Sequence, residues 1–365
     1  MLRILWLAPN FNHYKARFLN HLAKDADIDL TILSGIGRDQ MGDQELEEDW
    51  SFKQVKLNVT KKDFGRSKKV KETLKPIFKD FDWVLIPAEK KNLPLFLFAM
   101  RLRKEHTSVR LFSYNHSKLK SSNGLYSFLD SRLTKFFNDN LDRIIFYSQE
   151  ACEKAIHNKL VAPQKAFWAN NTVDNTEIQK HYIYQLLPKD SQTILFIGRL
   201  IPSKRVSDLI KYYKLLRQNH QNLKLEIIGD GPDKSLIETE IIEDSNINWH
   251  GTLVDEADIA PIMERVSLVF IPGLSGLSIN HAFAYGKPYL TLKADKHGPE
   301  IDYLVDGENG YILDDDLETD VKKISQLLEN RELLISFSNK AKEKSEYLSV
   351  KNWVHQIKSS LLHES

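Results

Sequence analysis

The chain has 365 residues, of which 42% are hydrophobic, and its 51 Lys and Arg residues almost balance its 50 Asp and Glu residues. This length exceeds what a single hydrophobic core usually serves, and the apolar content is enough for packed cores, so two domains are expected. The longest dense apolar run, Leu93 to Met100, is far too short to cross a bilayer, and Met1 to Asn10 lacks the basic start and cleavage site of a signal peptide, so we expect a cytoplasmic protein. The single cysteine, Cys152, excludes an internal disulfide, and we expect it to pack inside a helix.

Apolar, β-rich segments alternate with segments of helical periodicity along the chain, which is typical of parallel sheets covered by helices. We therefore predict an α/β fold of two Rossmann-like domains, at residues 1–175 and 190–346, joined by a linker at about 175–192. A C-terminal helix at about 347–365 is expected to be able to pack back on the first domain. The candidate strands are Arg3 to Pro9, Asp29 to Gly35, Phe52 to Leu57, Asp82 to Pro87, Val109 to Asn115, Asp142 to Ser148 and Ala166 to Thr172, then a series that begins at Ile194 and includes Leu223 to Gly229, Ile247 to Gly251, Leu268 to Pro272 and Tyr289 to Leu292.

The loop after the first candidate strand carries polar side chains. Open parallel sheets bind ligands beyond the carboxyl ends of their strands, so residues in such loops are the first candidates for a site. Asn10 and His13 are candidates for contact with an acceptor or a phosphate. Asn12 is suited to cap the helix that follows.

The N-terminal part of the chain is basic. The first 120 residues contain 23 Lys and Arg residues against 15 Asp and Glu residues. An anionic membrane or a phosphate-bearing acceptor fits such a surface, at about 1 kcal/mol for each cation near a membrane, and an ordinary solvated helix face fits it as well. Nucleic acid is disfavoured, because only Phe64 and Phe78 interleave with the cations and no known binding module is visible. We call the densest cluster the basic patch: Lys61, Lys62, Arg66, Lys68, Lys69, Lys71, Lys75 and Lys79.

The run FIGRLIPSK, Phe196 to Lys204, places a strand, a glycine turn and two cations directly before a helix. Gly198 lets the backbone approach a ligand closely, and the guanidinium of Arg199 and the ammonium of Lys204 are suited to a diphosphate. The alternative is an ordinary strand–turn–helix unit with solvated cations, which any α/β protein contains.

A second glycine turn follows the strand that ends at Pro272. Ser278 is predicted to be the N-cap of a short helix. The backbone amides of Gly276, Leu277 and Ser278 are then expected to point at the same anion as the two cations. A nucleotide diphosphate fits between them.

These runs resemble the donor-binding half of the family 4 glycosyltransferases of the GT-B class. The resemblance also rests on the order and spacing of LKLEIIGDGP (223–232), NWHG (248–251) and HGPEIDYLVDGENGYIL (297–313). It covers about residues 142–350 well and the first 140 residues in pattern only. It implies a GT-B fold of two Rossmann-like domains that face a cleft. It also implies retaining transfer of a sugar from a nucleotide-diphosphate sugar to a hydroxyl acceptor, in the synthesis of a cell-surface polysaccharide or glycolipid.

The resemblance assigns roles to particular residues. Arg199, Lys204, Glu300 and His116 take catalytic positions, with His116 facing the donor sugar across the cleft. The chain departs from the family at two positions: Gly273 and His281 stand where the family has two glutamates, the first for the donor sugar and the second for the ribose. We expect His281 to bond a ribose hydroxyl instead. The remaining donor-binding positions are Gly198, Gly229, Leu253, Gly276, Leu277 and Ser278.

Two other functional classes stay open. A non-catalytic GT-B protein that binds a nucleotide sugar is favoured by the missing glutamates, and a GT-B-like epimerase or phosphorylase would use the same donor site. No cofactor is expected beyond the nucleotide-sugar substrate. No metal site is expected either, because the pairs Asp25/Asp27 and Asp27/Asp29 precede a strand and Asp314 to Asp316 form an acidic loop.

Overall fold

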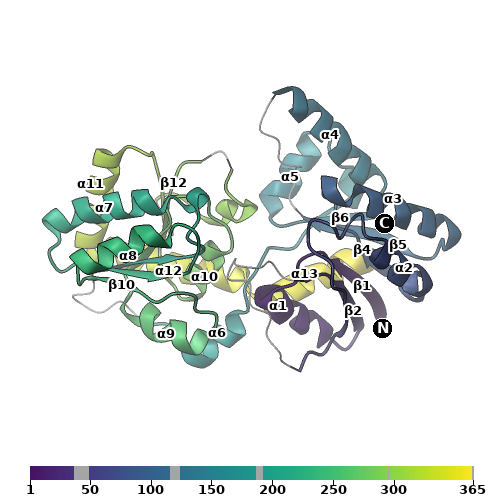
Figure 1. Ribbon diagram of the computed structural model, residues 1–365, viewed down its shortest axis with the longest axis horizontal. Coiled ribbons are helices and arrows are strands. Elements are labelled where there is room, and N and C mark those ends of the chain that lie inside the picture. The colour runs from purple at the N-terminus through teal and green to yellow at the C-terminus, as the bar shows by residue number, and fades with distance from the viewer. Residues whose placement is uncertain (37–48, 116–123, 186–191, 295, 364–365) are drawn as a thin grey trace. The chain divides into compact units, whose positions relative to one another are not determined.

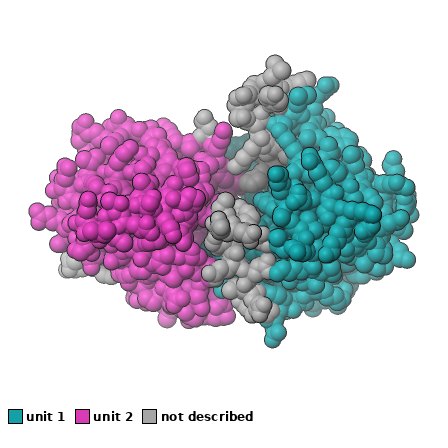
Figure 2. Space-filling view, viewed as in Figure 1, with its two compact units in different colours: residues 1–39, 43–171, 350–365 teal, residues 40–42, 172–349 magenta. Residues whose placement is uncertain are grey.

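A computed structural model describes residues 1–36, 49–115, 124–185, 192–294 and 296–363, with side chains in the third segment from 129 onward. The chain forms two compact units (Figure 2). Unit 1 runs to Asn171 and also takes the C-terminal residues from Val350, and unit 2 comprises Thr172–Ser349. The stretch expected to be a linker contains a helix of unit 2, α6 (Asn175–His181).

Unit 1 is built on a seven-stranded parallel sheet of order β3-β2-β1-β4-β5-β6-β7 (Figure 1). Alternate residues of β1 enter opposite cores: Leu5 and Leu7 face one, and Ile4 and Trp6 face the other. The strands are β1 (Leu2–Ala8), β2 (Ile28–Ser34), β3 (Lys53–Lys56), β4 (Trp83–Leu85), β5 (Arg110–Asn115), β6 (Arg143–Phe146) and β7 (Ala166–Trp168).

Helices cover both faces of this sheet. One face carries α2 (Lys68–Ile77), α3 (Leu93–Glu105), α4 (Gly124–Asp139) and α5 (Gln149–His157), and the other carries α1 (His13–Ala23) and α13 (Val350–Leu362). Cys152 is buried on α5, as expected of a packing residue, and burial raises the pKa of its thiol to about 12.

The C-terminal helix α13 belongs to the core of unit 1. Trp353 is buried, packs against Trp6 and Phe18, and donates a hydrogen bond through Nε1 to the Tyr114 hydroxyl at 3.0 Å. The last turn is fixed by Arg143, which donates to the His363 carbonyl at 2.8 Å. The two ends of the chain therefore stabilise the same core.

Unit 2 has a six-stranded parallel sheet of order β10-β9-β8-β11-β12-β13 around one continuous core. The strands are β8 (Thr193–Ile197), β9 (Lys224–Ile228), β10 (Ile247–Trp249), β11 (Leu268–Phe270), β12 (Tyr289–Leu292) and β13 (Gly310–Leu313). The helices are α6, α7 (Val206–Asn219), α8 (Lys234–Glu243), α9 (Glu256–Arg265), α10 (Ser278–Ala284), α11 (Leu317–Glu329) and α12 (Arg331–Tyr347). Every candidate strand of the sequence is present: β12 has the predicted bounds, β1 and β2 are shifted by one residue, β8 begins one residue earlier, and the others are shorter. The strand β13 was not predicted.

Candidate functional site

The strand order of unit 2 reverses between β8 and β11, because the chain runs outward to β9 and β10 on one side and to β12 and β13 on the other. In open α/β sheets the crevice for a ligand lies at this point, beyond the carboxyl ends of the two strands. The loop after β8 contains Arg199 and Lys204, and the loop after β11 contains Gly273 to Leu277. The two segments selected from the sequence therefore flank the switch point of the sheet.

The loop after β8 is packed tightly against its neighbour after β9. Gly229 has a φ of +141°, and a Cβ atom on it would lie 1.9 Å from the Gly198 carbonyl oxygen, so only glycine fits there. At Gly198 a Cβ would lie 3.6 Å from Lys204 Cε, which is ordinary contact. Gly229 thus lets the loop after β9 approach the loop after β8 closely.

Lys204 is the cation of this loop that burial affects most directly. Its Nζ donates a hydrogen bond to the Leu274 carbonyl at 2.6 Å. Burial and the nearby charge of Arg199 lower the pKa of Lys204 to about 8, while Glu300 acts in the opposite direction. Arg199, Lys204 and Glu300 are therefore close enough to interact, and two partly desolvated cations face one carboxylate.

Gly273 lies against the backbone of the loop after β8, which carries Lys204 and which we call the lysine loop. A Cβ atom on it would lie 2.2 Å from the Ser203 carbonyl oxygen and 2.5 Å from Lys204 Cα. Its amide donates to the Lys204 carbonyl at 3.1 Å, and the Leu274 amide donates to the Ser203 carbonyl at 2.8 Å. The glutamate that the family carries at this position has no room here, because the space of its side chain is filled by the loop that carries Lys204.

Hydroxyl groups form a hydrogen-bonded cluster next to the loop after β11. The Ser275 hydroxyl lies 3.0 Å from the Thr291 hydroxyl and accepts from Tyr289, which also lies 2.8 Å from the Ser278 hydroxyl. Ser278 was expected to be the N-cap of α10, and this is wrong: it is the first helical residue, the N-cap is Leu277, and no side chain caps the helix. The Ser278 hydroxyl instead contributes to the loop's hydroxyl cluster through its contact with the Tyr289 hydroxyl.

His297 orients the same loop through both ring nitrogens. Its Nδ1 accepts from the Ser275 amide at 3.0 Å, and its Nε2 donates to the Leu292 carbonyl at 2.9 Å. Burial, with a further contribution from the charge of Lys204, lowers the pKa of His297, so the imidazole is neutral in this arrangement.

His281 is buried on α10 and pairs with a carboxylate that the sequence analysis missed. Its Nε2 lies 3.1 and 3.2 Å from the two carboxylate oxygens of Glu256, which opens α9. The Tyr285 hydroxyl also donates to Glu256, at 2.7 Å. Acidic residues are common in the first turn of a helix, where they interact favourably with the helix dipole. Nothing local in the sequence therefore marks Glu256 as part of this cluster.

The other donor-side candidates lie as follows. Glu300 is buried in a short 3-10 helix (Pro299–Tyr303), and its Oε2 would be 3.6 Å from a Cβ on Gly276. Leu277 and Leu253 are half-buried and pack against the core of unit 2. Leu253 follows β10 in the loop that leads to α9. These residues all lie at the carboxyl end of the sheet.

The candidates of unit 1 flank the carboxyl end of β1. Asn10 and His13 are both buried, and the Asn10 carbonyl accepts from Lys15 Nζ at 2.9 Å. Asn12 caps α1 as predicted, because its side chain accepts from the Lys15 amide at 3.2 Å. His116 lies outside the described residues.

The three aspartates of the acidic loop after β13 each contact another residue of unit 2. Asp314 pairs with Lys293, Asp315 pairs with Arg205, and Asp316 caps α11 by accepting from the Thr319 amide at 2.9 Å. Over the part of the chain that the structure describes, no three His, Cys, Asp or Glu side chains gather as a metal-binding group.

The chain is similar to known glycosyltransferases in sequence and in fold. The model of the family described as "Glycosyl transferases group 1" matches residues 179–344, which lie within unit 2. An "Uncharacterized glycosyltransferase" of Haemophilus influenzae is 23% identical over 327 residues, covering 86% of this chain and 84% of the relative. The "Poly(ribitol-phosphate) alpha-N-acetylglucosaminyltransferase" of Staphylococcus aureus is 30% identical over 165 residues, covering 43% of this chain and 33% of the relative.

Among solved structures, Anabaena Alr3699/HepE in complex with UDP superposes with a TM-score of 0.70 at 15% identity, over 99% of both chains. The protein thus has the GT-B fold. Together with the family match and the curated relatives, this makes it an enzyme of the glycosyltransferase type. No helix within the described segments is long and apolar enough to cross a bilayer.

Proposed function

We propose that the protein transfers a sugar, with retention of configuration, from a nucleotide-diphosphate sugar to a hydroxyl acceptor in the synthesis of a cell-surface polysaccharide or glycolipid. The observation that carries this proposal is the pair of cations, Arg199 and Lys204, at the switch point of unit 2, with the pKa of Lys204 lowered to about 8. A diphosphate would relieve the repulsion between them. The relatives support the acceptor class, because they include a poly(ribitol-phosphate) alpha-N-acetylglucosaminyltransferase and a poly(glycerol-phosphate) alpha-glucosyltransferase.

In this proposal the two cations act mainly in the transition state. The diphosphate gains negative charge as the glycosidic bond breaks, and fixed cations in a partly dehydrated site stabilise that charge without reorganisation. Because the cations supply this charge, we propose that no divalent ion is required. The carboxylate of Glu300 accepts hydrogen bonds from sugar hydroxyls, a task for which position 273 has no side chain.

The ribose is assigned to the pair of His281 and Glu256. His281 Nε2 is already engaged by the Glu256 carboxylate. We therefore propose that the pair, rather than the imidazole alone, meets the ribose hydroxyls, because a carboxylate has acceptor sites left after it accepts from one histidine.

The test is release of nucleoside diphosphate from a panel of UDP-, GDP- and ADP-sugars, with and without hydroxyl acceptors. Acceptor-dependent release by the wild type and loss of release in Arg199→Ala support the proposal. Binding without any release would indicate a non-catalytic nucleotide-sugar protein. Release that needs free phosphate, or conversion of the sugar without release, would indicate a phosphorylase or an epimerase.

We further propose that the basic patch of unit 1 faces an anionic membrane or phosphate-bearing acceptor. Helix α2 buries Val70 and Leu74 and directs most of its lysines to solvent. Phe64 and Phe78 are fully buried, so they offer no stacking platform for nucleic acid bases. Replacing Lys68, Lys69 and Lys75 with Glu should abolish binding to phosphatidylglycerol liposomes at low salt and leave nucleotide affinity unchanged. A wild type that ignores such liposomes would contradict the membrane proposal.

A further inference from the structure

One residue at the start of α7 has a backbone conformation that its type disfavours. Arg205 joins a 3-10 turn (Pro202–Lys204) to α7 and has φ +57° and ψ +47°, in the left-handed region. A side chain with a Cβ is strained there, and glycine adopts the same angles without penalty. Such strain persists only where the surroundings hold the residue firmly.

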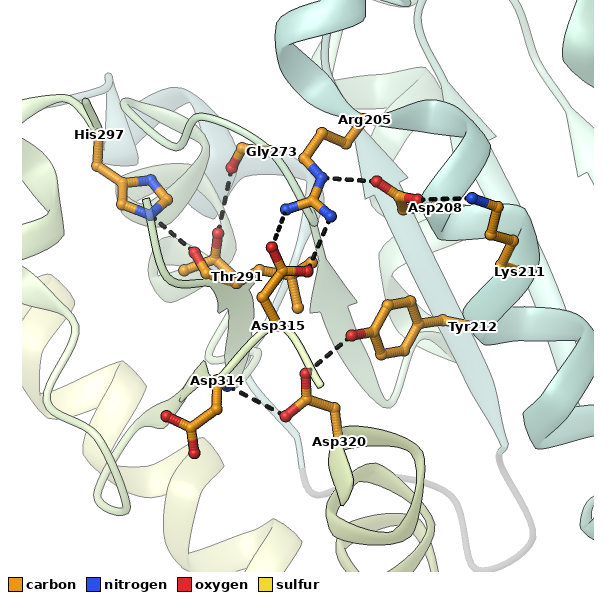
Figure 3. A network of polar contacts seen from close by, with 11 residues as sticks. Arg205, Asp208, Lys211, Tyr212, Gly273, Thr291, His297, Asp314, Asp315 and Asp320 are labelled. Carbon is orange, nitrogen blue, oxygen red and sulfur yellow. Dashed lines mark hydrogen bonds and ion pairs between the residues drawn. The ribbon is translucent and has the colours of Figure 1, made fainter. Parts of the chain in front are cut away.

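The Arg205 guanidinium is held by carboxylates from two directions (Figure 3). Its Nη1 and Nη2 donate to the two oxygens of Asp315 at 2.7 and 2.8 Å, and its Nε donates to Asp208 at 2.6 Å. This two-pronged geometry with Asp315 is the arrangement that a planar guanidinium favours. Asp315 itself has a φ of +68°. Two residues in the left-handed region thus face each other across one ion pair.

The pair connects two loops that are distant in sequence. Arg205 follows Lys204 directly, and Asp315 lies between β13 and α11. Deeper in the same unit, Tyr212 of α7 donates to Asp320 of α11 at 2.8 Å, and Asp320 also accepts from the Asp314 amide. The starts of α7 and α11 are therefore tied both at their surface and in their core.

Residues 203 and 204, at the end of the loop after β8, contact the loop after β11 through hydrogen bonds. Ser203 and Lys204 accept from the backbone of residues 273 and 274, and Lys204 Nζ donates to Leu274. Ser203 and Lys204 directly precede residue 205, so a change in the backbone angles of residue 205 would displace these two residues relative to α7.

We propose that Arg205 and Asp315 form a latch that holds the 198–205 loop so that Lys204 stays desolvated and aimed at the switch point. Both are positioning residues: they act on the diphosphate through Lys204 and do not touch it. In this proposal the acidic loop after β13 has a positioning role, because its Asp315 anchors the 198–205 loop. The expected effect of the latch on diphosphate binding rests on the proposed function. Its expected effect on the opening of the loop rests on the geometry alone.

Glycine variants separate the latch from ordinary stability. Arg205→Gly removes the ion pair and accepts the left-handed angles, so the variant should keep the melting temperature of the wild type. The matched control is Lys159→Gly, because Lys159 is exposed, has a φ of +56° and lies in unit 1. Asp315→Asn breaks the same pair from the other side, and Arg205→Lys keeps the charge without the fork.

The first readout needs no ligand. Hydrogen exchange of the amides of Gly273 and Leu274 should become roughly a hundredfold or more faster in Arg205→Gly and Asp315→Asn, because a loop that is almost always closed in the wild type would then be closed only about one fifth of the time. Lys159→Gly should leave these amides unchanged, and Arg205→Lys should fall between. Exchange at the wild-type rate in both Arg205→Gly and Asp315→Asn would overturn the latch.

The second readout is calorimetric titration with the best-binding of UDP, GDP and ADP between pH 7.5 and 9.5. If the loop of Arg205→Gly holds its binding form about one fifth of the time, affinity falls roughly fivefold. The wild-type affinity should begin to decline near pH 8, as Lys204 loses its proton. In Arg205→Gly the decline should move to higher pH, because a solvated lysine titrates near its ordinary pKa.

The groups that face Lys204 and enter this profile are Arg199, Glu300 and His297. An unmoved pH profile together with unchanged affinity would contradict the latch. A wild type that binds none of the three diphosphates would reject the proposed donor site instead, and the hydrogen-exchange readout would then decide the latch by itself.

Discussion

Replacing Lys204 with methionine should stabilise the free protein and abolish diphosphate binding. Methionine has a similar length and no charge to desolvate. The pKa of Lys204 is about 8 instead of 10.5 because burial, aided by Arg199, penalises the ammonium. Lowering the pKa of Lys204 from 10.5 to about 8 corresponds to about 3 kcal/mol of unfavourable free energy at neutral pH.

The lost hydrogen bond from Nζ to the Leu274 carbonyl opposes this gain. A bond from a charged group contributes about 1.5 to 3 kcal/mol, so Lys204→Met should be more stable than the wild type by about 0 to 1.5 kcal/mol at pH 7. The sign of the pH dependence is fixed by linkage. Since the folded-state pKa lies below the unfolded value, the unfolded chain binds more protons between pH 8 and 10.5, and the wild type gains stability over that interval.

Denaturant unfolding of both proteins at pH 7 and pH 10, with calorimetric titration of UDP, measures these effects. The advantage of Lys204→Met should shrink or reverse at pH 10. Lys224→Met is the matched control, because Lys224 is exposed at the start of β9 and should show neither effect. A variant that is clearly less stable at pH 7, shows no dependence of this difference on pH and still binds UDP would contradict both the burial penalty on Lys204 and its role in diphosphate binding.

Three further outcomes follow from the same site. Activity should survive excess chelator, and strict dependence on magnesium or manganese would reject the metal-independent mechanism. Gly273→Ala should destabilise unit 2 by about 1 to 3 kcal/mol, because its Cβ would overlap the Ser203 carbonyl; wild-type stability in thermal unfolding would show that the loop yields freely. His281→Glu should lower nucleotide affinity and stability by placing a second carboxylate beside Glu256, and adding Glu256→Gln should restore both; identical affinity in all three proteins would make the pair a packing feature.

The fold was largely predictable because most strands of both sheets are short apolar runs bounded by turn residues, the exposed β3 (KQVK) being an exception. β13 was missed, since Gly310 opens it and the half-buried Tyr311 and Ile312 follow an ordinary turn sequence. The switch-point loops were also predictable, because glycines and paired cations are local signals. Contacts between helices were not: Glu256 meets His281 from 25 positions away, and Arg205 meets Asp315 across 110 positions. Neither partner can be inferred from local propensity, since each side chain alone is suited to solvent or to a helix end.

Calorimetric titration of the wild type and Arg199→Ala with UDP, GDP and ADP measures whether unit 2 holds a nucleoside diphosphate between Arg199 and Lys204. A hydrogen bond to a charged group is worth about 1.5 to 3 kcal/mol, so we expect Arg199→Ala to bind the preferred diphosphate roughly tenfold or more weakly while its unfolding temperature stays unchanged. Equal affinity of the two proteins for that diphosphate would contradict this binding site.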